Sequence, residues 1–417
     1  MEEQEKWYNR LQFSCVLATV LILPFSWRWA VMASLLVVAA SVAKVVAEKR
    51  IGNPSIGKVA KWSIATPIAY FLMLAAGVIY SADKEEALVI LGHRAAVLLL
   101  PLCALLTDTG YLGRRHVQLL GYALVLSVVV LLGVGIAEGN FEQVHHSYSS
   151  LYALVALTFV YSEVGLRWKQ VKVWERSVWA ASVVVLTLYI IYANSRAGIL
   201  CLYGLNVLFA GWLAVRWNWK AMLVAVVLLV GGVWLGARCL PGHVNRLEAL
   251  VAQEEAADEP SEAGQAVVEE SAAGYTRDAR YLIMQSAVRT IAGRPLFGYG
   301  LGDYNAALVR QYEADGYETG KESRYNAHNQ YLEVALSSGV VGVLLLLLYL
   351  VAPLAMCWHE RKWPWAVVAL TFIVMFSLLF ESMLNKQSGI LFISAVYVAM
   401  ALIISRAENK FGRLAES

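Results

Sequence analysis

The chain has 417 residues, of which 59% are apolar and only 16% are charged. A soluble domain carries about a quarter charged residues, so this composition excludes a soluble globular protein and indicates a polytopic membrane protein. The net charge of +3 does not indicate a particular partner, and we expect membrane lipids but no nucleic acid among the partners.

Long apolar runs predict an all-α polytopic membrane protein of about twelve transmembrane helices, since each span needs about 20 apolar residues. The predicted spans are 11–26, 29–47, 62–80, 87–106, 117–137, 149–166, 177–194, 198–215, 221–237, 330–356, 366–381 and 389–405. We therefore expect spans 1–9 within residues 1–237, spans 10–12 within residues 330–405, and a tail at 406–417.

The basic residues predict the orientation of these spans. Nineteen Lys and Arg residues flank the spans on one face, whereas the short loops of the other face hold four, namely Arg28, Lys84, Arg196 and Lys386. Positive charge accumulates on the cytoplasmic side of membrane proteins. Both termini and the tail are therefore predicted to be cytoplasmic, and the long polar stretch 238–329 is predicted to lie outside, between spans 9 and 10.

This outer loop is predicted to have two parts. Residues 253–270 are acidic and poor in large apolar side chains, which is typical of a mobile segment. Residues 276–329 are predicted to be helical, because Tyr281, Met284, Val288 and Ile291 recur at helical spacing. We expect this second part to fold against the membrane surface.

Breaker residues divide the helical part. Gly293-Arg294-Pro295 is expected to end the first helix, and the glycine-rich segment 298–302 is expected to form a turn. Asp303 is then expected to cap a second helix that reaches about Tyr312.

Arginines on the outer face are candidate phosphate ligands. Arg196 lies between two spans, and Gly198 after it is expected to let a ligand approach the backbone. Arg280 and Arg289 lie on the predicted outer helix, and Arg94 lies near the outer end of the fourth span. The alternatives are a snorkelling side chain for Arg196, a solvated charge for Arg280 and an interfacial position for Arg94.

A polar segment leads into the tenth span. It contains His328, Asn329 and Tyr331, followed one turn later by Glu333. A histidine here is a candidate general base, with Asn329 and Glu333 expected to orient its ring, and the alternative is a hydrogen-bonded structural residue.

The motifs on this face occur in a characteristic order. They are Asn194-Ser195-Arg196-Ala197-Gly198, Arg280-Tyr281, Arg294-Pro295-Leu296-Phe297-Gly298-Tyr299-Gly300 and Ala327-His328-Asn329-Gln330-Tyr331-Leu332. Together with the large outer loop, this pattern resembles the O-antigen ligase family of bacterial inner-membrane proteins, which includes related polymerases. The resemblance covers roughly residues 190 to 390, including Glu381-Ser382 and Gly389, and the N-terminal third matches only in hydropathy.

The resemblance implies a glycosyltransferase at the periplasmic face of the bacterial inner membrane. Its donor would be a glycan on undecaprenyl pyrophosphate, and its acceptor a sugar hydroxyl of the lipid A-core. Arg196 and Arg280 would bind the pyrophosphate, and His328 would act on the acceptor hydroxyl. Asn329, Tyr331, Arg94 and Arg289 are further predicted substrate ligands.

The chemistry of the residues agrees with this implication. Guanidinium groups match phosphate geometry and stay charged, and a histidine with a reference pKa of about 6.5 suits proton removal near neutral pH. The sequence has no Asp-x-Asp, no His-Glu-x-x-His and no phosphate-binding glycine loop followed by lysine. We therefore predict a mechanism without a metal or other cofactor.

Other functions remain open from the sequence. An O-antigen polymerase uses the same donor, and Arg289 and Gly300 have a spacing found in polymerase loops, although a glycine at that spacing is also expected by chance. A twelve-span transporter or flippase is the alternative from a different class, disfavoured because no internal repeat with broken spans is visible. An O-linked protein glycosyltransferase is a further enzyme option.

Overall fold

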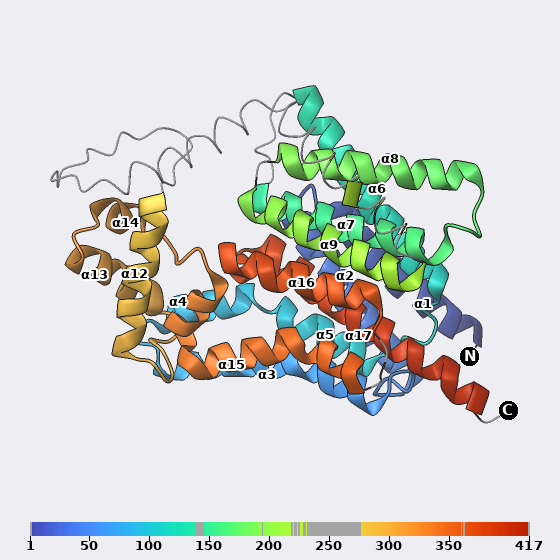
Figure 1. Ribbon diagram of the computed structural model, residues 1–417. Coiled ribbons are helices and arrows are strands. Elements are labelled where there is room, and N and C mark those ends of the chain that lie inside the picture. The colour runs from blue at the N-terminus through green and yellow to red at the C-terminus, as the bar shows by residue number, and fades with distance from the viewer. Residues whose placement is uncertain are drawn as a thin grey trace. The chain divides into compact units, whose positions relative to one another are not determined.

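The computed structural model describes residues 2–138, 146–193, 195–217, 277–359 and 363–415, with the single residues 220, 223, 226, 227, 231 and 361. The acidic stretch 253–270 and almost all of the predicted span 221–237 lie outside these residues. The described chain contains helices and no β-strand, so the expected all-α class is confirmed (Figure 1). The helices are α1 (Glu2–Ile22), α2 (Trp27–Glu48), α3 (Lys58–Tyr80), α4 (Lys84–His93), α5 (Ala96–Leu106), α6 (Arg114–Glu138), α7 (His146–Arg167), α8 (Val173–Tyr192), α9 (Arg196–Arg216), α12 (Arg277–Gly293), α13 (Tyr304–Ala314), α14 (Glu318–Ser323), α15 (Gln330–His359), α16 (Trp365–Phe380), the 3₁₀ helix η1 (Met383–Asn385) and α17 (Gln387–Ala415).

The chain divides into two compact units. The first contains Met1–Leu205 and Ile283–Ser417, and the second contains Asn206–Leu282. The described part of the second unit holds the C-terminal half of α9 and the first turns of α12. The remaining helices belong to the first unit.

Many of the helices are those of a polytopic membrane protein. Among the described residues, eight helices are long and apolar enough to cross a membrane, namely α2, α3, α6, α7, α8, α9, α15 and α17. The pair α4 and α5, bent by 47°, counts as a ninth if it forms one span. Helices α1 and α16 coincide with predicted spans without meeting this standard, so the number twelve stays a prediction.

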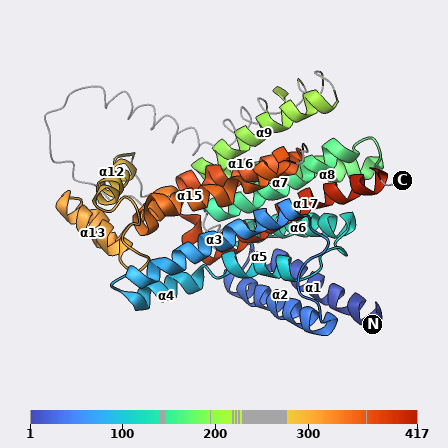
Figure 2. The same ribbon diagram turned by 90° about the horizontal axis from the view of Figure 1, so that it is seen from below.

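The centre of the first unit is built by α3, α15 and α17. Helix α3 packs along α15, as both views show (Figures 1 and 2). Three buried tyrosines join the helices: the ring centroids of Tyr70 and Tyr349 are 6.1 Å apart, and those of Tyr349 and Tyr397 are 4.5 Å apart. Such ring pairs add specific geometry to apolar burial, so they set how these helices pack.

Helix α15 is not the single straight span that the sequence predicted. Gly339 interrupts it with φ 63° and ψ −163°, a conformation that side chains with a Cβ rarely adopt. A Cβ added at Gly342 would lie 3.1 Å from Val334 Cγ1, eight residues earlier, whereas such residues are about 12 Å apart along a straight helix. Residues 330–338 therefore fold back toward residues 340–359, so α15 covers the predicted span 330–356 with a sharp bend, and a single crossing over this range stays a prediction.

The glycine-rich segment occupies the break in α15. Tyr299 N and Gly300 N donate to the carbonyls of Leu336 and Ser337 at 2.8 and 2.9 Å, which satisfies carbonyls at the end of residues 330–338. Gly298 has φ 68°, and a Cβ there would lie 2.5 Å from Ser338 N. The segment predicted as a simple turn therefore also fastens the outer helices to α15, and only glycine fits at residue 298.

Asp303 departs from the expected capping role. It precedes α13, but its side chain makes no hydrogen bond to that helix. Its carboxylate instead accepts hydrogen bonds from the N–H groups of Ala82 and Asp83, at 2.6 and 3.1 Å. Asp303 therefore joins the start of α13 to the connection between α3 and α4, because those N–H groups precede α4 and lack helical acceptors.

Candidate functional site

His328 lies in the connection before α15. Its φ of 43° is in the left-handed region, and its N–H donates to Asn326 Oδ1 at 3.0 Å. His328 Nδ1 lies 3.5 Å from Glu381 Oε1, and the two side chains are 19% and 15% exposed. Partial exposure lets a substrate reach the imidazole, and a neighbouring carboxylate favours the tautomer with its proton on Nδ1.

Asn329, which was expected to orient the imidazole, and Tyr331, a predicted substrate ligand, make other contacts. Asn329 Oδ1 accepts from the N–H groups of Tyr331 and Leu332 at 2.9 and 3.2 Å, so it caps the first turn of α15. The Tyr331 hydroxyl donates to the carbonyl of Met375 at 2.9 Å. These contacts give Asn329 and Tyr331 structural roles, and their part in substrate binding stays a prediction.

Glu333 lies at the centre of a buried polar cluster and is 1% exposed. Its Oε2 accepts from the N–H of Ala327 at 3.1 Å and from Ser382 Oγ at 3.3 Å, and its Oε1 accepts from Asn385 Nδ2 at 2.6 Å. The carboxylate therefore links the residue next to His328 with the connection between α16 and α17. We call Glu333, Ser382, Asn385, Arg94 and Tyr304 the Glu333 cluster.

Arg94 enters the cluster from the break between α4 and α5. It is 1% exposed, and its Nη2 donates to Asn385 Oδ1 at 2.7 Å. Asn385 thereby connects Arg94 to Glu333, which compensates two buried charges that are costly alone. Arg94 Nε and Nη1 have no hydrogen-bond acceptor in the described protein. The guanidinium is therefore enclosed by the protein, and it keeps two N–H groups for another acceptor.

Tyr304 brings the outer helices into the same cluster. This first residue of α13 is 7% exposed, and its phenol is close enough to feel the charges of Glu333 and Arg94. Burial, and then the charge of Glu333, raise the pKa of Tyr304 well above its ordinary value. The phenol therefore stays protonated at neutral pH and serves as a hydrogen-bond donor.

A further bond fixes the connection that carries Glu381. Gln330 is fully buried, and its Oε1 accepts from the N–H of Leu384 at 2.7 Å. Together with the bonds from Ser382 and Asn385 to Glu333, it holds residues 381–386 against the fold-back segment 330–338. This attachment places Glu381 beside His328.

Arg196 is the first residue of α9, and its side chain, like Asn194, lies outside the described residues. A Cβ at Gly198 would lie 2.7 Å from Ser150 Cβ, on α7. Gly198 therefore permits close packing of α9 on α7, because Ser150 occupies the space in which a ligand was expected to approach the backbone.

The arginines of α12 have separate surroundings. Arg280 is half-buried and belongs to the second unit, whereas the Glu333 cluster is built from the first unit alone. In the first unit, Arg289 Nη1 lies 2.6 Å from Asp315 Oδ1. Ser286 and Gln311 also donate to Asp315, at 2.6 and 2.9 Å. Arg289 therefore fastens α12 to the end of α13, and its role as a substrate ligand stays a prediction.

The surroundings of Asp315 change its acidity. Burial raises the pKa of Asp315, but the hydrogen bonds from Ser286, Gln311 and Arg289 lower it by more, so the net pKa lies below the ordinary value. The contact between α12 and α13 is thus maintained by an ionised carboxylate at neutral pH.

Several residues of the site were not identified as such from the sequence. Asn385 and Tyr304 carry no local pattern that sets them apart from other polar residues near span ends. Glu381 and Ser382 had one signal, since Glu381-Ser382 belongs to the motifs that carry the family resemblance. Glu333 is a charged residue within an apolar helix, which is itself a signal of function.

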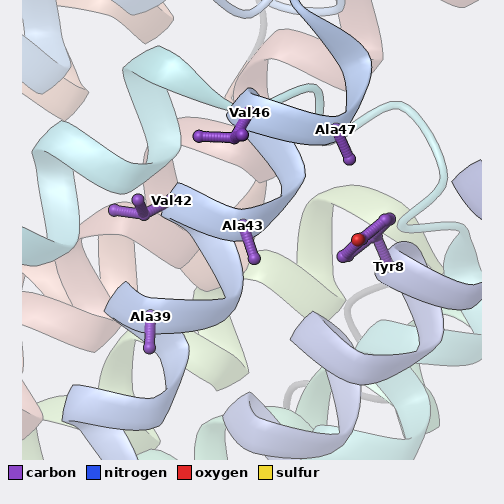
Figure 3. A pocket seen from close by; sticks show the side chains of 6 residues that line it. All are labelled: Tyr8, Ala39, Val42, Ala43, Val46 and Ala47. Atoms are coloured by element: carbon purple, nitrogen blue, oxygen red, sulfur yellow. The ribbon is translucent and has the colours of Figure 1, made fainter.

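An apolar groove of about 530 Å³ lies between α1 and α2 (Figure 3). None of the predicted site residues lines it. Its lining consists of one tyrosine from α1 and small apolar residues from α2, namely Tyr8, Ala39, Val42, Ala43, Val46 and Ala47. The groove offers no group for acid–base or phosphate chemistry besides a phenol, so the candidate site is His328 with the Glu333 cluster.

Within the described ranges, no group of three or more His, Cys, Asp or Glu side chains is placed to hold a metal ion. Independence from metals is a property of the reaction, so it stays a prediction for experiment.

Part of the chain matches a known family. No curated protein matches the chain. Residues 181–347 match the family model described as O-antigen ligase, a range that contains Arg196, Arg280, His328 and Glu333. Arg94, Glu381 and Asn385 lie outside the matched range. Over residues 181–347 the chain is similar to the O-antigen ligase family, as its motifs predicted.

Proposed function

We propose that this protein transfers a polysaccharide from undecaprenyl pyrophosphate to a sugar hydroxyl of the lipid A-core, at the periplasmic face of the bacterial inner membrane. The observation that carries the proposal is the pairing of Glu381 with His328, which itself lies in the segment that matches the O-antigen ligase family. The topology proposed with it has cytoplasmic termini, a periplasmic loop at 238–329 and a cytoplasmic tail at 406–417.

The proposed reaction is a single displacement at the anomeric carbon of the donor. The acceptor oxygen forms the new bond to this carbon, its proton passes to His328, and the bond from the carbon to the pyrophosphate oxygen breaks. The leaving group is the lipid pyrophosphate, on which negative charge increases as the bond breaks. Arg196 and Arg280 are proposed to bind this group, since stabilising such charge is often the largest catalytic contribution.

Glu381 is proposed to position the imidazole. A carboxylate 3.5 Å from His328 Nδ1 favours a proton on that nitrogen, which leaves Nε2 to accept the proton of the acceptor hydroxyl. The carboxylate also stabilises the imidazolium that forms. Glu381 is thus a positioning residue, and His328 is the proposed catalytic base.

Arg94 is proposed to contact the donor phosphates from within the bundle. Its Nε and Nη1 groups are buried without an acceptor, and a buried charged donor left unsatisfied is costly. A phosphate oxygen would satisfy them, while Asn385 and Glu333 hold the guanidinium in place. Arginines at the phosphates supply the charge that a metal ion provides in other transferases, so we propose a metal-independent mechanism.

A deletion strain tests the proposed function. Loss of a ligase leaves free lipid A-core together with surplus lipid-linked polymer. Core capped by a single repeat would instead identify a polymerase, which uses the same donor. Lipid-linked glycan retained on the cytoplasmic face would identify a flippase and would overturn the proposal of an enzyme.

A further inference from the structure

An exposed apolar segment lies at the break of α15. Leu296 and Phe297 are 60% and 57% exposed, although both are large apolar residues in the loop that follows α12. On α12, Met284 and Val288 are 48% and 56% exposed, on a face about 100° around the helix from the buried Ile283 and Ala287. A water-exposed loop rarely presents a cluster of this kind without a partner.

The segment is continuous with the lipid-facing side of α15. Val340 N donates to the carbonyl of Pro295 at 2.8 Å, so the loop touches the first residue after the break. From there, Val340, Leu344 and Leu348 form an exposed stripe at intervals of one helical turn. The apolar surface of the loop and that of the span therefore form one surface.

The length of α15 places the loop at the boundary of the hydrocarbon core. Residues 340–359 give about 30 Å of helix, which equals the thickness of that core. Trp358 is 76% exposed and lies near Trp363, as expected of the aromatic belt at one membrane boundary. Val340, at the other end of the span, then lies at the opposite boundary together with Leu296.

The backbone of this loop is suited to an apolar environment. The carbonyls of Pro295 and Leu296 accept from the N–H groups of Val340 and Val341, and the carbonyl of Phe297 accepts from the Tyr80 hydroxyl at 2.7 Å. Irregular backbone is tolerated at membrane depth only where the protein satisfies its polar groups.

Polar groups lie where headgroups and water would be. Arg294 is exposed beside the segment, with its guanidinium 5.1 Å from the centre of the Tyr299 ring. On α13 and α14, Glu313 and Glu318 have side chains 60% and 66% exposed. A basic residue next to an apolar face is typical of a segment bound to lipid headgroups.

We propose that residues 294–297 insert into the outer leaflet of the bilayer, with Leu296 and Phe297 among the acyl chains and Arg294 at the phosphates. The Met284 and Val288 side of α12 then rests on the same leaflet. This inference concerns the lipid surface and is independent of the proposed transfer reaction.

Site-specific fluorescence in lipid nanodiscs tests the insertion. The native cysteines are first replaced, and an environment-sensitive thiol probe is attached to Phe297→Cys, with Leu344→Cys as the lipid-facing control and Glu318→Cys as the aqueous control. We expect nitroxide-bearing lipids to quench the probe at residue 297 about as strongly as at 344. Iodide in the buffer should quench only the probe at 318.

Quenching of residue 297 by iodide and not by lipid nitroxide would overturn the proposal and assign the surface to a water-borne partner or a second copy of the chain. Leu296→Cys repeats the measurement on the neighbouring side chain, so a folding defect of one variant does not decide the outcome. Met284→Cys reports on α12 and should show weaker lipid quenching than residue 297, because it would lie among headgroups.

Discussion

Replacing Glu333 by glutamine tests whether the Glu333 cluster holds the site together. The carboxylate accepts from Ala327 N, Ser382 Oγ and Asn385 Nδ2, so both of its oxygens are used. An amide keeps the shape but turns one acceptor into a donor. Whichever way the amide is turned, at least one buried donor then faces another donor.

The expected loss in the free energy of unfolding has two contributions. An unsatisfied buried donor costs about 1–3 kcal/mol, and removing one partner of a buried charge pair costs about 3–5 kcal/mol. The second figure is an upper bound here, because Asn385 separates Arg94 from Glu333. We expect Glu333→Gln to lower the free energy of unfolding by about 2–4 kcal/mol. We also expect kcat to fall, because Ala327 adjoins His328, and KM for the donor to rise, because Glu333 and Asn385 hold Arg94 at the proposed phosphate position.

The assay is unfolding of the purified protein by SDS titration in mixed micelles, combined with ligation rates in vesicles. Glu333→Asp is the matched control, since it keeps the charge and should recover part of both losses. In the Glu333→Gln background, Arg94→Met should cost less than it does alone, by a coupling of about 0.5–3 kcal/mol. Stability of Glu333→Gln within about 0.5 kcal/mol of the wild type would refute this account of the cluster.

Four further predictions concern the proposed chemistry and the outer helices. His328→Ala should slow transfer by roughly 10²–10⁴-fold while donor binding persists, and a loss below about tenfold would demote His328 to a structural residue. Arg196→Lys and Arg280→Lys should each ligate more slowly than the wild type at equal expression, because the ammonium group of lysine does not replace the planar guanidinium that binds two phosphate oxygens. Full activity of both variants would reassign the two arginines to structural roles. Acidification should weaken the contact between α12 and α13, because the pKa of Asp315 is lowered in the folded protein. The stability that Asp315 gives to this contact is complete above the unfolded pKa of about 3.9, and it is lost as pH falls through the folded pKa. Proteolysis in this region should rise over that range in the wild type, and an equal rise in Asp315→Asn would exclude Asp315 as its cause. Finally, EDTA should leave ligation by the purified protein unchanged, and inhibition by EDTA that magnesium reverses would contradict metal independence.

The existence and type of the helices were determined by the sequence alone. Runs of about 20 apolar residues form helices in a membrane because lipid cannot satisfy backbone hydrogen bonds, and this is a local requirement. The end of α12 at Gly293 was likewise predicted, since Pro295 removes a donor and restricts the residue before it. The similarity to the O-antigen ligase family also followed from sequence, because the motifs keep a fixed order along the chain.

The path of the chain at the site was decided by tertiary structure. Ser337-Ser338-Gly339 lies within an apolar run, and a single glycine in such a run is compatible with a straight helix. Gly339 becomes a break because residues 295–300 supply the hydrogen bonds that the helix loses there. Residues 295–300 are distant in sequence from Gly339. The apolar pattern of residues 330–356 by itself predicts an unbroken helix.

The partners of the charged residues depended on the same arrangement. Arg94 and Asn385 are 291 residues apart and meet only because α5 packs beside α17. Glu381, and not Glu333 as expected, lies beside His328, because the Glu333 carboxylate accepts hydrogen bonds from Ser382 and Asn385. A sequence determines which residues are charged and which segments enter the membrane. Which charges become neighbours depends on long-range packing, because buried charges are stable only with the partners that this packing brings to them.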